Sequence, residues 1–566
     1  MRIRSSVWIS GTSDRRVTRL RRGLIGSVVL GLTWSASAAA QTVSIIPRPV
    51  SVRTEAGHFT LDARTVIWTD PASAQVAHQL ARYLEPATGW TLQVQIGGPV
   101  PGGAIALRRD PSLTRLGAEG YALGVRSAGV DARAPELAGL FYAVQTIRQL
   151  LPAAILRDAP ISTIGSSSEW RMPAVTIEDR PRFAWRGGHL DSGRHFMPKE
   201  FIKKYIDLLA LHKLNTFHWH LTDDQGWRIE IKQYPRLTAI GSCRKETIVG
   251  RQSRDETQWK FDGTAHCGFY TQDDLREIVA YAKARYVTIV PEIEMPGHAV
   301  AAIAAYPELG VTGDRMEVAT RWGVFSDIFN AEPATVAFLQ NVLTEVMQIF
   351  PGRYIHVGGD EADKAKWKTS ARIQARIKEL GAGDERGLQI WFIRSMEAFL
   401  ASNGRRLIGW DEPRDGGLSE NAVVMSWRGV EGGIAAARAG HDVVMTPTSH
   451  TYFDYYQSKD QAHEPLAIGG FLPLEMVYAY DPIPEQLEPQ FASHVLGAQG
   501  QIWTEYMPTP KQVEYMAFPR LAALAEVVWS SKEGRDYSDF VRRLEAHLPR
   551  LQSLDVNYRP IADPVK

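Results

Sequence analysis

The chain has 566 residues, of which 44% are hydrophobic and 10% aromatic, so it is long enough to bury more than one core. Its formal net charge is +1, and no long run of one sign occurs in the sequence. This balance gives no electrostatic basis for binding nucleic acid or an anionic membrane surface. The 16 tryptophans are costly to expose, so they indicate buried cores or the walls of a binding site.

The first 40 residues have the pattern of an export signal. Arginines up to Arg22 precede an apolar stretch, residues 23–32, and small residues follow as far as Ala40. The apolar stretch is too short to span a bilayer comfortably, which argues against a membrane anchor. We therefore predict a signal peptide over residues 1–40 and an exported mature protein, periplasmic or secreted, without a membrane span.

Residues 41–172 mix short apolar runs with helix-length stretches, which is typical of a small α+β domain. The strand candidates are residues 65–68, 92–96, 104–107 and 121–125, and the helix candidates are residues 74–84 and 134–151. A Ser/Gly-rich segment, residues 162–168, is the candidate linker to the next domain. No notable acidic cluster occurs in this domain.

Residues 173–535 differ, because short apolar runs alternate there with amphipathic segments of helix length. Eight runs indicate buried strands: residues 186–190, 216–221, 287–293, 354–357, 406–409, 423–426, 442–445 and 495–502. This alternation predicts an α/β fold, a (β/α)8 TIM barrel, with residues 536–566 as a C-terminal helical tail. An open doubly wound sheet is the competing fold, but no Gly-rich phosphate fingerprint follows the first run.

Helices are expected between the runs, over residues 201–214, 273–285 and 333–350 and, as one long helix, around residues 373–401. Thr271, followed three residues later by Asp274, is a reasonable N-terminal cap for the second of these helices. Pro333 suits the first turn of the third helix.

The only two cysteines, Cys243 and Cys267, lie in one charged connecting segment. In an exported protein, two cysteines so close in sequence favour a single disulfide that closes a long loop. Their spacing matches no convincing zinc pattern. Two unpaired thiols are the alternative.

Chemistry-bearing residues follow every predicted strand of the barrel. In chain order they are Asp191 and Arg194; Asp223 and Asp224; Glu294 and His298; Asp360 and Glu361; Trp410, Asp411 and Glu412; Trp427; Tyr452 and Asp454; and Trp503 and Glu505. The chemistry of such a barrel belongs at the carboxyl ends of its strands. Carboxylates combined with Trp and Tyr suit a sugar, because its C–H faces pack on aromatic rings and its hydroxyls take charged partners.

Four motifs in these positions resemble one known family. They are RGGHLDSGRHF at residues 186–196, FHWHLTDDQGWR at 217–228, PEIEMPGH at 291–298 and HVGGDE at 356–361. Together they resemble the β-N-acetylhexosaminidases of glycoside hydrolase family 20, over residues 173–530. The resemblance implies an exo-acting, retaining enzyme that removes terminal β-linked N-acetylglucosamine or N-acetylgalactosamine, preceded by the family's non-catalytic α+β domain.

The resemblance also implies the catalytic roles. Glu361 corresponds to the general acid/base, and Asp360 to the residue that holds and polarises the substrate's 2-acetamido group. The acetamido oxygen then attacks C1 in place of a protein nucleophile and forms an oxazolinium intermediate, which is an exception to the usual two-carboxylate scheme.

The remaining implied roles concern substrate binding. Tyr452 would bond the acetamido oxygen, and Asp223 with His298 would support the catalytic acid. The expected walls are Trp410, Trp427 and Trp503, and the expected hydroxyl-binding residues are Arg194, Asp454 and Glu505.

The residues themselves support this division of labour. Two adjacent acids at one strand end could not easily lie on opposite sides of C1, as an ordinary retaining glycosidase requires. A nucleophile within the substrate removes that requirement. We further expect Asp360 to be ionised and, through like-charge repulsion, to make Glu361 hold its proton more tightly.

Three alternatives stay open. His218 and His220 share a strand face and could belong to a metal-dependent barrel hydrolase, but no second histidine cluster accompanies them, so no metal or other cofactor is expected. A sugar-binding module without catalysis is disfavoured by the intact Asp360, Glu361 and Tyr452. A lacto-N-biosidase-like enzyme that releases disaccharides belongs to the same family. The expected partner is a carbohydrate; the oligomeric state and the preference between the two amino sugars stay open.

Overall fold

The computed structural model of the protein describes residues 43–160, 170–412 and 421–561. The predicted signal peptide and the predicted linker, residues 162–168, lie outside these ranges. Within them, no helix combines the length and the apolar character that crossing a bilayer requires.

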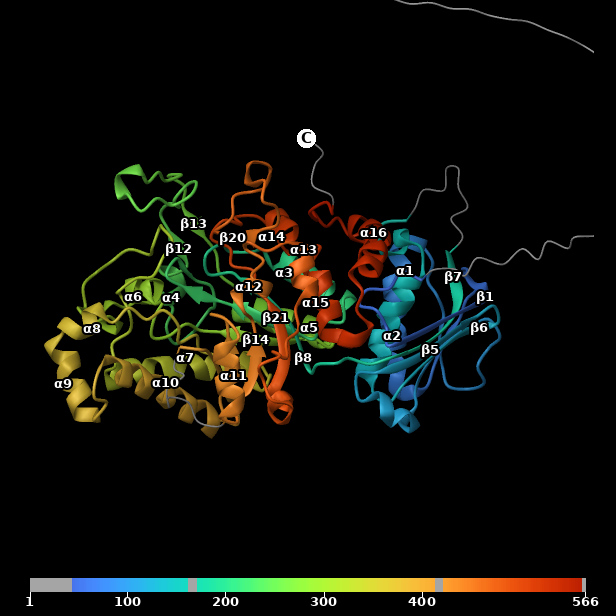
Figure 1. Ribbon diagram of the computed structural model, residues 1–566, viewed down its shortest axis with the longest axis horizontal. Helices are drawn as coiled ribbons and strands as arrows, with labels where there is room; N and C mark the ends of the chain where they lie inside the picture. The colour runs from blue at the N-terminus through green and yellow to red at the C-terminus, as the bar shows by residue number, and fades with distance from the viewer. Residues whose placement is uncertain (1–42, 161–169, 413–420, 562–566) are drawn as a thin grey trace, which may run out of the picture. The chain divides into compact units, whose positions relative to one another are not determined.

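Eight parallel strands close into a barrel (Figure 1). In barrel order they are β14 (Thr288–Glu292), β15 (Tyr354–His356), β16 (Arg406–Trp410), β17 (Val423–Ser426), β18 (Asp442–Met445), β21 (Val495–Gly500), β8 (Trp185–Asp191) and β9 (Thr216–His220). Each coincides with one of the eight predicted runs, so the predicted (β/α)8 barrel is confirmed.

The strands are buried on both faces, which explains why they appear in the sequence as continuous apolar runs rather than as alternating ones. One group of barrel side chains is apolar and includes Trp185, Val290, Ile408, Met425 and Val444. A second buried group is polar and comprises His189, His218, His220, Glu292, His356, Gln499 and Gln501. The polar group belongs to the same strands whose carboxyl ends carry the predicted site.

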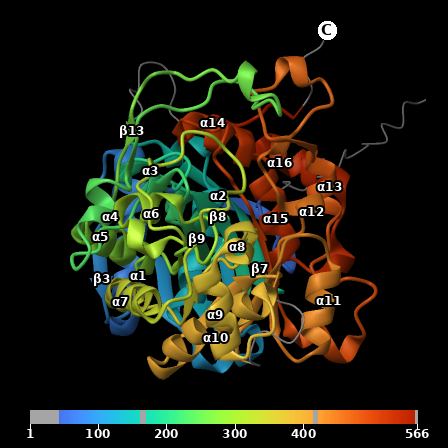
Figure 2. The ribbon, with the colours of Figure 1, turned by 90° about the vertical axis from the view of Figure 1, so that its left-hand side faces the viewer.

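Helices surround the barrel strands, as Figure 2 shows. Those that follow barrel strands include α3 (Lys199–Leu211), α5 (Gln272–Lys283), α7 (Pro333–Ile349), α10 (Glu385–Ser402), α11 (Glu431–Arg438) and α15 (Arg520–Trp529). The predictions for α3, α5 and α7 are confirmed. Thr271 and Asp274 form a reciprocal capping box at α5, and Pro333 opens α7.

The predicted long helix around residues 373–401 is wrong, because the chain breaks there into α9 (Ala371–Leu380) and α10. Gly381 ends α9 with φ at +64°, and Gly383 has φ at +83°. Asp384 then starts α10, since its side chain accepts a hydrogen bond from the backbone N–H of Gly387. Two glycines in left-handed conformations stop a helix that the amphipathic pattern alone would continue.

The first domain contains a seven-stranded sheet in the order β1-β7-β5-β6-β4-β2-β3. Its elements are β1 (Ser51–Leu61), β2 (Ile67–Thr69), α1 (Ala74–Thr88), β3 (Val94–Ile96), β4 (Ile105–Arg109), β5 (Tyr121–Arg126), β6 (Gly129–Ala134), α2 (Leu137–Leu150) and β7 (Trp170–Asp179). The sequence prediction missed β1, β6 and β7. The predicted boundary between residues 172 and 173 falls inside β7, whose pairing with β1 and β5 extends this sheet to Asp179.

Shorter elements occupy the loops beyond the barrel strands: β10 (Thr222–Asp223), β11 (Gly226–Trp227), α4 (Arg236–Ala239), β12 (Cys243–Arg244), β13 (His266–Cys267), α6 (Val300–Ala305), α8 (Ala365–Thr369), α12 (Thr448–Thr451), β19 (Tyr455–Tyr456), β20 (Gly469–Phe471), α13 (Leu474–Ala479) and α14 (Pro510–Ala517). In the range predicted as a helical tail, the structure has α16 (Tyr537–Ser553).

Candidate active site

A pocket of about 210 Å³ lies at the carboxyl ends of the barrel strands. Its lining comprises Arg194, His298, Asp360, Glu361, Trp410, Trp427, Thr448, Tyr452, Asp454, Tyr455, Ile468, Trp503 and Glu505. The barrel therefore gathers into one pocket every predicted catalytic and substrate-binding residue except Asp223. Asp223 lies directly behind the lining, bonded to Arg194 and close to His298.

The two adjacent acids are placed by a tight turn after β15. Gly358 has φ at +67°, and a Cβ at this position would lie 1.7 Å from Glu294 Oε2. Only glycine therefore fits at this point of the turn. Glu361 itself has φ at +43°, a conformation that costs a non-glycine residue of order 1–3 kcal/mol. The fold thus holds Glu361 in a strained position at the pocket rather than in a relaxed loop.

His298 connects the acids to the support behind them. Its Nδ1 lies 3.0 Å from Asp224 Oδ2, and its Nε2 lies 3.5 Å from Glu361 Oε2 and 3.8 Å from Asp360 Oδ2. Because both ring nitrogens face carboxylates, the ring is an imidazolium. Burial lowers the pKa of His298, but Asp223 and the surrounding hydrogen bonds raise it well above its ordinary value.

The resemblance named Asp223 and His298 as the pair that supports the catalytic acid, but Asp224 lies closer to His298 than Asp223 does. Asp223 Oδ1 is 3.5 Å from His298 Nδ1, against 3.0 Å for Asp224 Oδ2. Asp224 also accepts a hydrogen bond from the backbone N–H of Val300 at the start of α6. The sequence shows two adjacent aspartates, but only the three-dimensional fold shows that both lie beside His298 and that Asp224 is the nearer one.

The expected protonation order of the two acids is wrong for the unliganded protein. The hydrogen bond from His298 lowers the pKa of Glu361 below its ordinary value. Burial raises the pKa of Asp360 to about 6, and the neighbouring Glu361 adds to this shift. The like-charge repulsion that we expected at Glu361 is therefore outweighed by a cation that approaches from another strand.

Arg194 is the second buried cation of the site. Its Nη2 lies 2.9 Å from Asp223 Oδ2 and 3.9 Å from Glu505 Oε1, and its guanidinium lies 5.0 Å from the centre of the Trp503 ring. Burial lowers the pKa of Arg194, but Asp223 and Glu505 raise it well above its ordinary value. Arg194 thus stays charged while it faces the pocket.

Several buried polar atoms of the pocket have no hydrogen-bond partner. They are Nε and Nη1 of Arg194, Oδ1 of Asp360, Oδ1 of Asp454 and Oε2 of Glu505. Buried polar groups are almost always paired in folded proteins. The residues that carry these atoms line one pocket, and their carboxyl and guanidinium groups are complementary to a ligand with many hydroxyl and amide groups.

The aromatic walls are fixed by hydrogen bonds from their indole N–H groups. Trp410 donates to Glu292 Oε1 at 2.9 Å, and Trp427 donates to Glu412 at 3.2 Å. The Trp427 and Tyr452 rings are nearly parallel, with their centres 6.4 Å apart. Rigid aromatic faces beside the charged side chains of the same pocket suit the mixed apolar and polar surface of a sugar ring.

Glu412 is a residue whose role the sequence analysis did not assign. It holds Trp427, and its carboxylate lies 3.7 Å from the Arg428 guanidinium. Burial raises the pKa of Glu412 to about 8, with a further contribution from Asp360. Its place at a predicted strand end was the only sequence signal for it.

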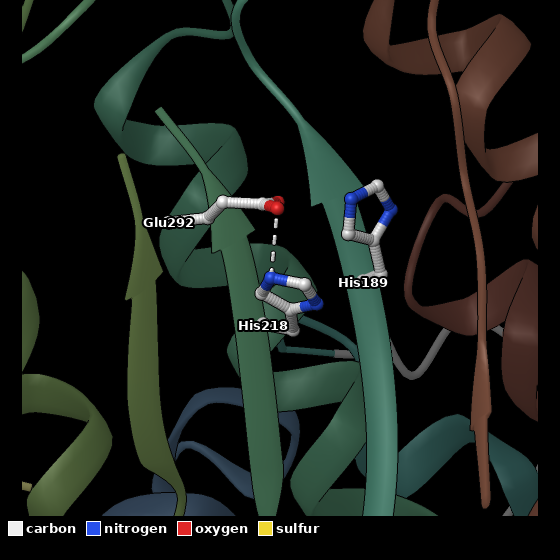
Figure 3. A group of neighbouring side chains, drawn as sticks. All are labelled: His189, His218 and Glu292. Atoms are coloured by element: carbon white, nitrogen blue, oxygen red, sulfur yellow. Dashed lines mark ion pairs between the residues drawn. The ribbon is translucent and has the colours of Figure 1, made fainter. Parts of the chain in front are cut away.

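The candidate metal-binding trio His189, His218 and Glu292 lies inside the barrel (Figure 3). His189 Nδ1 accepts a hydrogen bond from the backbone N–H of Ile502, and His218 Nδ1 accepts one from the Gln499 amide. Each neutral ring therefore carries its proton on Nε2, and its Nδ1 lone pair is already engaged by a hydrogen bond. A histidine that binds a metal needs a free lone pair on one nitrogen and donates a hydrogen bond from the other. The donor pattern of this trio does not fit a metal site.

The other His/Asp/Glu groups of ligand spacing contain His220 or His298. Both nitrogens of each ring are directed at carboxylates. As imidazolium ions, these rings have no lone pair to offer a metal. His220 and His298 therefore serve as hydrogen-bond donors to carboxylates.

Cys243 and Cys267 are joined by a disulfide across the β12–β13 pair. It closes a long loop, from which Arg251 donates hydrogen bonds to the carbonyl oxygens of Ala467 and Ile468. Ile468 lines the pocket. The disulfide-closed loop thus supports the outer rim of the site.

A parallel barrel whose mouth brings together paired carboxyl groups, buried cations and aromatic walls belongs to the class of glycoside hydrolases. Comparison with protein families specifies which one. Residues 183–532 match the catalytic domain of glycosyl hydrolase family 20, and residues 42–180 match domain 2 of the same family. The chain belongs to glycosyl hydrolase family 20, which confirms the resemblance found in the four motifs.

Relatives of known name agree with this assignment. A beta-hexosaminidase of Porphyromonas gingivalis is 44% identical over 523 residues, which are 91% of this chain and 64% of that protein. A beta-N-acetylhexosaminidase of Cellulomonas fimi is 34% identical over 515 residues, 90% of this chain and 94% of that protein. The chain thus spans less than two thirds of the Porphyromonas relative and nearly all of the Cellulomonas one.

Solved structures give the same result. The family 20 beta-N-acetylhexosaminidase of Streptomyces coelicolor matches with a TM-score of 0.78 and 34% identity, covering 91% of this chain and 97% of that one. The family 20 exo-beta-N-acetylglucosaminidase of Vibrio harveyi, solved in complex with N-acetylglucosamine, matches with a TM-score of 0.79 and 33% identity. That match covers 92% of this chain and 79% of the other.

The raised pKa of Asp360 predicts that its charge destabilises the fold. The pKa of this carboxyl group rises from 3.8 to about 6 on folding, so the folded state loses stability as the pH rises from 3.8 to about 6. At pH 7 the cost is about 3 kcal/mol, at 1.36 kcal/mol per pKa unit. Asp360→Asn should therefore melt at a higher temperature than the wild type at pH 7, with the difference vanishing near pH 4. Thermal melts at both values check this, with the exposed Asp314→Asn as control; a less stable Asn variant at pH 7 would contradict it.

Proposed function

We propose that the protein is an exo-acting, retaining β-N-acetylhexosaminidase. It would hydrolyse terminal, non-reducing β-linked N-acetylglucosamine or N-acetylgalactosamine with help from the substrate's own acetamido group. The observation that carries this proposal is the lining of one pocket, which brings the acids Asp360, Glu361, Asp454 and Glu505 and the cation Arg194 together with aromatic walls. The walls are Trp410, Trp427 and Trp503.

The pocket size favours a single sugar ring. Its volume of about 210 Å³ is below the ~300–1,000 Å³ of pockets that enclose drug-sized ligands. A pocket for one ring gives an exo-acting enzyme, because longer chains can enter only by their end. A lacto-N-biosidase-like release of disaccharides would need room for two rings.

In the proposed reaction, the acetamido carbonyl oxygen attacks C1 while the bond from C1 to the leaving oxygen breaks. Glu361 donates its proton to that leaving oxygen and becomes a carboxylate. The attack leaves a positive charge on the acetamido group, which the Asp360 carboxylate stabilises. Water, which transfers a proton to Glu361, then attacks C1 while the bond from C1 to the acetamido oxygen breaks and restores the neutral acetamido group. Two inversions at C1 leave its configuration retained.

The adjacency of Asp360 and Glu361 supports this route. Both acids follow one strand, β15, and both lie within 4 Å of the same nitrogen, Nε2 of His298. A retaining enzyme with its own nucleophile needs two carboxyl groups on opposite sides of C1. Two acids clustered around one imidazolium are better suited to act on neighbouring atoms of one substrate, the leaving oxygen and the acetamido group.

The relatives supply the substrate class. The Vibrio harveyi structure is that of an exo-beta-N-acetylglucosaminidase with N-acetylglucosamine bound. We extend that substrate class to this chain because the described residues place both acids, the cation Arg194 and the aromatic walls around one pocket.

The acetamido dependence can be measured directly. The purified enzyme should hydrolyse an aryl β-N-acetylglucosaminide at least about 10³-fold faster than the matching aryl β-glucoside, because the glucoside lacks the attacking amide. A chelator should leave the rate unchanged. Equal rates on the two substrates, or an adduct between C1 and an enzyme side chain with a fluorinated slow substrate, would refute the substrate-assisted route. Rapid release of disaccharides would favour the lacto-N-biosidase alternative.

The role of Glu361 as proton donor predicts a dependence on the leaving group. Glu361→Gln should reduce kcat by about 10²–10⁴ on substrates with poor leaving groups. The loss should be much smaller with a dinitrophenyl leaving group, which departs without protonation. Asp363→Asn, an exposed acid two residues further along, is the matched control. Equal losses on both substrates would count against the assignment.

We further propose that the mature protein is exported, as the pattern of residues 1–40 indicates. The disulfide between Cys243 and Cys267 supports this, because such bonds persist in oxidising compartments. Mass spectrometry of the protein recovered from cell fractions should place the N-terminus of the mature chain near Ala40. A mature chain that begins before Gly23 would contradict the signal peptide.

A further inference from the structure

Glu292, at the end of β14, is a fully buried carboxylate beneath the pocket. Its Oε2 lies 2.5 Å from His220 Nδ1 and 3.1 Å from His218 Nε2. Its Oε1 lies 2.9 Å from Trp410 Nε1 and 2.7 Å from His356 Nδ1. His220 donates a hydrogen bond to Oε2 and Trp410 donates one to Oε1. His356 Nδ1 instead accepts a hydrogen bond from the backbone N–H of Gly358, so it lies against Glu292 without donating to it.

The strand register creates this arrangement. Glu292 pairs with His220 of β9 on one side and with His356 of β15 on the other. The three residues thus form one row across neighbouring parallel strands, at the same height in the barrel. Such a row is fixed by the closed barrel and cannot slide by one residue without turning every side chain to the other face.

His220 connects Glu292 to Asp223, which lies behind the pocket lining. Its Nδ1 faces Glu292, and its Nε2 lies 3.0 Å from Asp223 Oδ2. A histidine can donate from both nitrogens only as an imidazolium. Burial lowers the pKa of His220, but Glu292 and Asp223 raise it to about 10.

The charged and titratable groups that surround His220 come from several elements. They are Glu292 of β14, Asp223 of β10, Glu294 with Oε1 4.0 Å from Nδ1, Asp191 and His189 of β8, His218 of β9 and His356 of β15. The two carboxylates in direct contact with the ring are Glu292 and Asp223.

Asp223 connects this core to the substrate-binding surface. Its Oδ2 receives His220 at 3.0 Å and Arg194 at 2.9 Å, and its Oδ1 lies 3.5 Å from His298. The groups therefore alternate in charge from Glu292 through His220 and Asp223 to the two cations that face the pocket. In addition, Glu292 holds the Trp410 wall directly.

We propose that Glu292 and His220 are positioning residues for the reaction proposed above. By holding Trp410 directly and Asp223 through His220, Glu292 fixes one aromatic wall of the pocket and, from beneath it, the orientation of Arg194 and His298. Neither residue lines the pocket, so each acts through others.

Glu292→Gln is the sharpest test, because it keeps the side-chain shape and removes the charge. The amide has one acceptor oxygen, and its NH2 group would face either His220 or Trp410, each of which donates to the wild-type carboxylate. His220 would lose one carboxylate partner and could no longer hold both protons as firmly. A misplacement of about 1 Å in the groups above would reduce kcat/KM by about 10²-fold.

Nitrogen-15 NMR of histidine-labelled enzyme measures the proposed link without any substrate. His220→Gln identifies the His220 signals by their loss. In the wild type, both ring nitrogens of His220 should remain protonated at pH 8. In Glu292→Gln, His220 should lose one proton at a pH at least one unit lower than in the wild type, and the alkaline limb of kcat/KM should shift in the same direction.

Val290→Ala is the matched control, since Val290 lies on the same strand within the apolar barrel cluster. It should lower the melting temperature while leaving the His220 signals and the pH profile unchanged. A neutral His220 in the wild type at pH 8 would overturn the proposal, even if Glu292→Gln fails to fold. So would a His220 titration that is the same in wild type and Glu292→Gln. If the NMR result holds but the acetamido dependence is absent, the positioning network stands and the proposed function fails.

Discussion

The site depends on an imbalance of charge in a small buried space. Four carboxyl groups, those of Asp360, Glu361, Asp454 and Glu505, line the pocket, but only two cations, Arg194 and His298, lie among them. Burial raises the pKa of Asp360, Asp454 and Glu505, since an ionised carboxylate loses its hydration there. In the proposed reaction, a transition state with oxocarbenium character would bring positive charge into this pocket, where acids outnumber cations.

The same arrangement of site residues lowers the stability of the folded protein. Glu361 and His298 both have positive φ values, +43° and +49°, although neither is glycine. Around them lie buried polar atoms without partners. Each such feature persists only because the surrounding barrel is closed and densely packed. The stability of the barrel strands thus offsets the strain at Glu361 and His298, whose backbones would relax on an isolated loop.

The sequence contained most of the fold and most of the site, but not the order of protonation. The eight strands appeared as apolar runs because both of their faces are buried, and the strand ends then located the pocket residues. Edge strand β1 was missed, since most of its side chains are exposed and no apolar run marks it. The break before α10 was missed because the amphipathic pattern continues across Gly381 and Gly383. What a single sequence could not supply was which neighbours would meet. His298 approaches Glu361 from the loop after β14, and Glu292 accepts hydrogen bonds from His220 of β9 and Trp410 of β16.

In the proposed reaction, the position of His298 would let one carboxyl group serve two opposite steps. Glu361 would first donate a proton and then, as a carboxylate, accept one from water. A pKa of Glu361 far above or far below the working pH would favour one of these steps and impede the other. The imidazolium lowers the pKa of Glu361 in the empty pocket. A bound sugar would displace water from beside Glu361 and bring Asp360 close to its acetamido group as a carboxylate, and both changes raise that pKa. Once the leaving group has departed, the positive charge on the acetamido group and on His298 again favours the carboxylate. The network behind His298 therefore has to be rigid, because a shift in the imidazolium would alter both steps at once.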